Sequence, residues 1–204
     1  MPPQLTEEFI QERLQAAYRP DVLAVGDREP EYFAGIRLKC AAVLVPLAWW
    51  TDEWQVVFTR RTETVEHHKG QVSFPGGGCE IGETTPEETA LREANEEIGL
   101  NPADVRLLGR LNDSLTVTGF RVTPVVGVIG WPFPLRLETA EVGRVFTIPL
   151  IWLADRSNWE EEPFTPPGRQ AAVRVIRYHL YDGEILWGAT ARITHLFLRV
   201  LGLL

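Results

Sequence analysis

The segment that most constrains the fold is a helix predicted over residues 86–98, because both of its ends carry clear signals. Thr85 is a typical N-cap residue, and Pro86 suits the first helical position. Glu88 completes a capping box with Thr85, and Gly99 is the kind of residue that ends a helix in the left-handed conformation. One face of this helix is apolar and can meet a core, and it is formed by Ala90, Leu91, Ala94 and Ile98.

The rest of the chain mixes helical and strand-like segments. Apolar residues recur at helical spacing over residues 5–18, before Pro20. Apolar, β-rich runs predict strands at 37–50, 54–61, 71–74, 104–111, 120–131, 144–150 and 171–181. The first two are joined by a predicted hairpin at residues 51–53, residues 62–82 are otherwise expected to be loop, and residues 160–170 read as a proline-rich surface loop.

This order of segments predicts one α/β (α+β) domain across residues 1–204, a sandwich with a mixed central sheet. Residues 1–35 form an N-terminal helix and extension in this interpretation, and residues 188–204 form a C-terminal helix that docks on the core.

Charge and cysteine content limit the classes of partner. The chain carries 28 acidic against 20 basic side chains, a net charge of −8, which argues against nucleic acid or an anionic membrane as partner. A phosphate-bearing small molecule remains compatible if metal ions mediate the contact. Cys40 and Cys79 show no spacing typical of a disulfide scaffold, and the N-terminal residues lack the pattern of a signal peptide. We therefore expect a cytoplasmic protein without a disulfide.

Three glutamates of the predicted helix share one face. Glu93, Glu96 and Glu97 stand at positions i, i+3 and i+4, where like charges cost a few tenths of a kcal/mol per pair. A solvated acidic face fits this spacing, and so does a site for a hard divalent cation such as Mg²⁺, which takes oxygen ligands. The preceding Gly76–Gly78 favours the metal site, because backbone without Cβ atoms can approach closely.

The combined spacing resembles the box of the Nudix hydrolases, G-x5-E-x7-R-E-U-x-E-E-x-G-U, where U is aliphatic. Gly77, Glu83 and the run "REANEEIGL" match it with one extra residue before Arg92. The resemblance implies a Nudix α/β/α sandwich in which Glu93, Glu96 and Glu97 bind Mg²⁺ or Mn²⁺ with help from the Gly76 carbonyl. It also implies that Arg92 orients these glutamates and that Glu83 supports the loop behind them.

Upstream, "FTRRTETVEHHKGQVSFPGG" at residues 58–77 offers donors for phosphate oxygens, namely Arg60, Arg61, His68 and Lys69, although ordinary surface charge is the alternative. This run resembles the signature of the coenzyme A diphosphatases within the Nudix group, and so does "ILWGATARITHLFL" at 185–198. Glu66 departs from that signature, which has an arginine at its position.

The resemblance implies metal-dependent hydrolysis of coenzyme A to 4′-phosphopantetheine and adenosine 3′,5′-bisphosphate. We expect Glu93, Arg92, Glu97 and Glu141 to be catalytic, with Glu93 or Glu141 as the general base and Glu138 as the rival of Glu141. Hydrolysis of ADP-ribose, NADH or another nucleoside diphosphate derivative is the alternative, and a catalytically silent nucleotide sensor is a second one. The expected partner is a small nucleotide, neither nucleic acid nor membrane, and a homodimer stays open.

Overall fold

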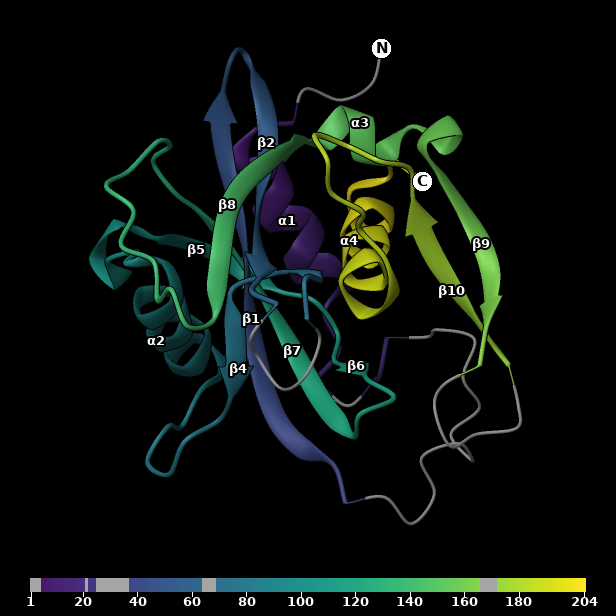
Figure 1. Cartoon of the computed structure of the whole chain (residues 1–204). Helices are drawn as coiled ribbons and strands as arrows, with labels where there is room; N and C mark the ends of the chain where they lie inside the picture. The colour runs from purple at the N-terminus through teal and green to yellow at the C-terminus, as the bar shows by residue number, and fades with distance from the viewer. Residues whose placement is uncertain (1–4, 21, 25–36, 64–68, 166–171) are drawn as a thin grey trace.

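The structure is a computed structural model that describes residues 5–20, 22–24, 37–63, 69–165 and 172–204 (Figure 1). Its centre is a mixed eight-stranded sheet with the order β3-β2-β1-β7-β5; β4 also pairs with β1, β6 with β7 and β8 with β2. The strands are β1 (Lys39–Trp50), β2 (Glu53–Arg61), β3 (Val72–Ser73), β4 (Gly76–Gly78), β5 (Arg106–Arg110), β6 (Ser114–Leu115), β7 (Phe120–Val128) and β8 (Val142–Pro149). Strands β1 and β7 run parallel and the other pairs are antiparallel, so the predicted mixed sheet is confirmed.

Helices cover both faces of this sheet (Figure 1). Helix α2 (Pro86–Ile98) lies on one face, and α1 (Glu7–Ala17) and α4 (Gly188–Leu201) lie on the other. A two-stranded ribbon of β9 (Trp159–Phe164) and β10 (Val173–Tyr178) flanks α4, and the short α3 (Leu150–Ala154) follows β8. Two 3₁₀ turns complete the elements, Pro102–Asp104 and Arg156–Asn158. The predicted sandwich is therefore confirmed, whereas the extent of a single domain over residues 1–204 stays a prediction.

The apolar runs of β1 and β2 are buried on both faces because successive side chains of a strand point to opposite sides. Val45 and Phe58 pack in the cluster that contains Ile10 of α1 and Phe197 of α4. The opposite cluster joins alternating residues of β1 and β2 to the apolar face of α2, and its members include Leu44, Ala48, Val57, Ala90, Ala94 and Ile98. The central strands thereby fix α2 against the sheet.

The predicted ends of α2 are confirmed. The Glu88 amide donates to the Thr85 hydroxyl at 3.3 Å, the Glu88 carboxylate accepts from the Thr85 amide at 3.1 Å, and Gly99 is left-handed with φ of 73°. The predicted hairpin between β1 and β2 is also present, and both Thr51 and Asp52 have positive φ, as a two-residue turn between twisted strands requires.

Two loop predictions are wrong. Gly76–Gly78 form strand β4, which pairs with Ala41–Val43 of β1. The two strands approach so closely that a Cβ at Gly76 would lie only 2.5 Å from the Ala42 carbonyl oxygen, so this position requires glycine. Most of residues 160–165, expected as surface loop, form the strand β9. Ion pairs across the ribbon, such as Arg174 to Glu161 at 2.9 Å, stabilise this acidic strand. In the part of the chain that the structure describes, β9 pairs with β10 alone, so it has a free edge that can accommodate Pro163.

The expectation of unpaired cysteines is also wrong, since Cys40 and Cys79 form a disulfide. The antiparallel pairing of β4 with β1 brings them together, and the Cys79 amide donates to the Cys40 carbonyl at 3.1 Å. Their 39-residue separation carries no local signal. Within the described residues no helix has the length and apolar character needed to cross a membrane. The cytoplasmic location stays a prediction.

The disulfide closes a loop of roughly forty residues that includes the whole of β2, so we expect it to stabilise the fold. Cys79→Ser should lower the free energy of unfolding by roughly 2–4 kcal/mol in urea titrations without reductant. Adding dithiothreitol should lower the free energy of unfolding of the wild type to that of the variant, and it should leave the value for the variant unchanged. A wild type whose unfolding midpoint ignores the reductant would contradict this expectation.

Candidate active site

Arg92, in the middle of α2, is the centre of a hydrogen-bonded network. Its Nε donates to Glu83 at 2.7 Å, and its Nη2 donates to the Gly78 carbonyl at 2.9 Å. Its Nη1 reaches Glu93 at 3.0 Å and Glu96 at 2.9 Å. Arg92 thus joins the glycine strand, the loop that contains Glu83 and the acidic face of the helix.

Glu83 is fixed from several sides. Besides Arg92, it accepts from its own loop at the Glu80 amide and from the Thr89 hydroxyl, both at 2.7 Å. The hydrogen bond from Arg92 is the largest cause that lowers the pKa of Glu83 to about 2. Sequence reasoning missed the contact of Thr89 with Glu83, because a threonine on the buried side of a helix usually indicates a residue that packs in the core. Glu83 therefore holds Arg92 in place and lies behind the acidic face.

Glu97 is the most buried acid of this face, with 5% of its surface exposed. Burial raises its pKa to about 8, against the opposing effects of Arg61 at 3.7 Å and of the Gly76 amide, which donates to Glu97 at 3.3 Å. Burial also raises the pKa of Glu93. Ionised Glu97 therefore needs compensation by cations or hydrogen-bond donors.

Glu141 joins the site from the opposite side. Its carboxylate lies 3.2 Å from Arg61 at the end of β2, and its carbonyl accepts from the Thr62 amide at 2.8 Å. The rival Glu138 accepts instead from the amide of Ala140 in its own turn, at 3.2 Å. Of the two acids, it is Glu141 that the structure brings to Arg61 and thereby to Glu97. Sequence reasoning did not find the contribution of Thr62 to the position of Glu141, because the contact joins residues that lie far apart in the sequence.

The predicted phosphate donors separate in space. Arg60 contacts Glu63 at 2.8 Å and Glu184 at 3.3 Å, away from the acids that Arg61 meets. Lys69 lies exposed in the turn before Gln71. His68 and Glu66 fall outside the described residues. The structure thus brings Arg61 to the acidic cluster, which consists of Glu93, Glu96, Glu97 and Glu141. Substrate contacts of Arg60, His68 and Lys69 stay predictions.

The donor chemistry of this cluster suits a hard divalent cation. Carboxylates and backbone carbonyls are the ligands such ions prefer, and a Cβ at Gly77 would lie 2.4 Å from the Glu93 carboxylate, so glycine is needed for that approach. In the described part of the chain, however, no three acidic, histidine or cysteine side chains gather tightly enough to hold one metal ion. Instead, Glu93 and Glu96 form ion pairs with Arg92, and Glu97 and Glu141 form ion pairs with Arg61.

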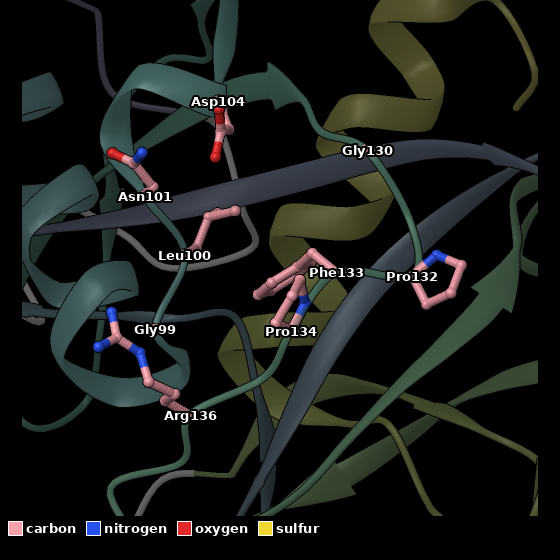
Figure 2. Close-up of a pocket in the computed structure, with 9 residues that line it drawn as sticks. All are labelled: Gly99, Leu100, Asn101, Asp104, Gly130, Pro132, Phe133, Pro134 and Arg136. Atoms are coloured by element: carbon pink, nitrogen blue, oxygen red, sulfur yellow. The ribbon is translucent and has the colours of Figure 1, made fainter.

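A pocket of about 650 Å³ lies beyond the acidic face, at the C-terminal end of α2 (Figure 2). Asn101 and Asp104 line one side of it, and Phe133, Pro134 and Arg136 line the other. The Arg136 amide donates to the Ile98 carbonyl at 3.1 Å, and the Glu138 amide donates to the Glu97 carbonyl at 3.0 Å. The same segment thus borders the pocket and continues toward Glu141.

Comparison with known proteins gives the class of this site. The family model of the NUDIX domain matches residues 40–180, more than half of the chain. The chain therefore belongs to the Nudix domain family.

Similar proteins carry the same family name. The chain is 34% identical over 155 residues to "Uncharacterized Nudix hydrolase NudL" of Photorhabdus laumondii, which covers 76% of this chain and 81% of the relative. It is 34% identical over 200 residues to "Nudix hydrolase 22, chloroplastic" of Arabidopsis thaliana, covering 94% of this chain and 66% of that protein. A solved Nudix hydrolase of M. smegmatis, RenU, is 22% identical with a TM-score of 0.49, covering 57% and 74% of the two chains.

The raised pKa of Glu97 predicts a pH-dependent stability in chelator-containing buffer. Folded Glu97 binds its proton more tightly than an unfolded glutamate with the ordinary value of 4.5, so this residue's contribution is present below pH 4.5 and is lost as pH rises toward 8. We expect the free energy of unfolding of the wild type, relative to Glu97→Gln, to fall between pH 5 and pH 8. Urea titrations at four pH values measure this difference, and parallel curves for the two proteins would refute the expectation.

Proposed function

We propose that this protein hydrolyses the diphosphate linkage of a nucleotide derivative with Mg²⁺ or Mn²⁺, and that coenzyme A is its preferred substrate. The observation that carries the proposal is the network in which Arg92 joins Glu83, Gly78, Glu93 and Glu96 beside the buried Glu97. Membership of the Nudix family supports the coarser activity, hydrolysis of a nucleoside diphosphate derivative.

In this proposal Glu93, Glu96, Glu97 and the Gly76 carbonyl hold the cations. When bound, such cations neutralise diphosphate oxygens and lower the pKa of a coordinated water. Arg92 fixes the direction of Glu93 and Glu96, and Glu83 fixes Arg92. The general base is Glu93 or Glu141, each of which belongs to the same cluster.

The coenzyme A preference rests on residues around the site. Arg61, a residue of the signature run, lies between Glu97 and Glu141, where its planar guanidinium can donate to two diphosphate oxygens. The second signature segment forms the start of α4, whose Thr190 hydroxyl donates to the Val72 carbonyl of β3 at 3.1 Å. This contact anchors the C-terminal helix beside β3, the strand that follows Gln71.

The glutamate at position 66 supports a second class of substrate, nucleoside diphosphate derivatives other than coenzyme A. A glutamate in place of the signature arginine repels a phosphate, which favours a substrate with fewer phosphates such as ADP-ribose or NADH. A silent nucleotide sensor is the less supported alternative, because the complete set of Glu93, Glu96 and Glu97 serves metal-dependent chemistry rather than simple binding.

A product-resolved assay tests this proposal. We expect kcat/KM to be higher for coenzyme A than for ADP-ribose or NADH at one Mg²⁺ or Mn²⁺ concentration, with 4′-phosphopantetheine and adenosine 3′,5′-bisphosphate as products. Glu97→Gln is the matched control: it keeps the side-chain shape and should lower turnover by more than about a hundredfold, because it removes a charged metal ligand. Coenzyme A ranking last would move the assignment to the other diphosphates, and absence of any turnover would favour the sensor.

A further inference from the structure

Arg61 contacts two acids that the proposed function assigns to different tasks. Its Nη1 lies 3.7 Å from Glu97, a proposed metal ligand, and its Nη2 lies 3.2 Å from Glu141, a candidate base. The Glu97 side chain is nearly buried, and the Arg61 side chain is 24% exposed. Because Glu97 is shielded from water, the charge of Arg61 acts strongly on this carboxylate, whereas its effect on the half-exposed Glu141 is weaker.

The two arginines of the site are held differently. Arg92 is anchored outside the cluster by Glu83 and by the Gly78 carbonyl. Within the described residues, the ion pairs of the Arg61 side chain go only to Glu97 and Glu141. Arg92 is therefore a fixed part of the scaffold, whereas the position of the Arg61 guanidinium depends on the state of two carboxylates.

The backbone around Glu141 does not depend on this ion pair. The Thr62 amide donates to the Glu141 carbonyl at 2.8 Å, and the Thr62 hydroxyl donates to the Ala140 carbonyl at 2.9 Å. Strand β8 also pairs with β2 along its length, with a register shift at Arg60 and Arg61. Removing the Arg61 side chain therefore takes away the ion-pair partner of the Glu141 carboxylate and leaves the backbone of Glu141 in place.

We propose that Arg61 is a positioning residue that competes with a divalent cation for Glu97 and Glu141 and pairs with the substrate diphosphate once the cation has taken their oxygens. The inference rests on the proposed function. The physical reason is that one carboxylate oxygen cannot fully satisfy a guanidinium and a divalent cation together, and that two cations repel each other at this range. A diphosphate offers the released guanidinium the paired oxygens that its planar donors fit.

The competition predicts effects of opposite sign for Arg61→Gln. Without substrate, Mn²⁺ should bind about tenfold more tightly or better, because a neighbouring positive charge has been removed. The value of kcat/KM should fall about a hundredfold, because a diphosphate donor is lost and Glu141 loses its partner. A residue with a merely structural role would weaken both properties together.

Two further variants separate charge from shape. Arg61→Lys keeps the charge without the planar fork, so its Mn²⁺ affinity should stay near that of the wild type while kcat/KM recovers only in part. Arg60→Gln removes the same charge from the adjacent position of β2, where the side chain faces Glu63 and Glu184. Its Mn²⁺ affinity should change less than about threefold, because only a screened, longer-range interaction remains.

The experiment measures Mn²⁺ dissociation constants by electron paramagnetic resonance of free Mn²⁺, for the wild type, these three variants and Glu97→Gln, with circular dichroism confirming that each is folded. Tighter binding in Arg61→Gln alone supports the inference. If Mn²⁺ binding depends on Glu97 but Arg61→Gln leaves the Mn²⁺ affinity unchanged or weakens it, the inference is overturned and the proposed function still stands. Mn²⁺ binding that does not depend on Glu97 would overturn the proposed metal site, and the inference with it.

Discussion

The charge of Glu97 is the constraint around which the site is arranged. A carboxylate buried between a helix and a sheet loses its hydration, and burial accordingly raises its pKa to about 8. Among the described residues, the Gly76 amide and the Arg61 guanidinium are the groups that compensate its charge. Two further acids, Glu93 and Glu141, add repulsion to the same carboxylate. Additional positive charge stabilises such a group as an anion, which supports the cation site that we propose at this place.

The glutamates of the site are placed by the packing of α2 on the sheet, by the glycines of β4 and by the disulfide. The apolar face of α2 packs on β1 and β2, so its acidic face is turned toward the glycine strand β4. The absence of side chains in β4 allows Glu93 and the β1 backbone to approach it closely. The disulfide holds the end of β4 to the beginning of β1, next to the carbonyl that anchors Arg92. Scaffold and site therefore share the same short segment of chain.

Local signals predicted the parts of the fold whose causes are local. The cap residues of α2 and the positive-φ hairpin act within a few residues, and both lie where the sequence placed them. The strand character of Gly76–Gly78 and of residues 159–164 and the disulfide depend on strand pairing between distant segments, which no local pattern carries. The acidic face of α2 was predictable from helical spacing. The separation of Arg60 from Arg61 was not, because it depends on which acids other elements bring to each side of β2.

The central claim is that the acidic face of α2 is a metal site. Anomalous diffraction from crystals soaked in Mn²⁺ tests it most directly, since it locates the ion independently of catalysis. The account predicts an anomalous peak within coordination distance of the Glu93 and Glu97 carboxylates, next to the Gly76 carbonyl. Crystals in which Mn²⁺ binds only elsewhere, while Arg92 keeps its contacts with Glu93 and Glu96 and Arg61 keeps its contacts with Glu97 and Glu141, would contradict it.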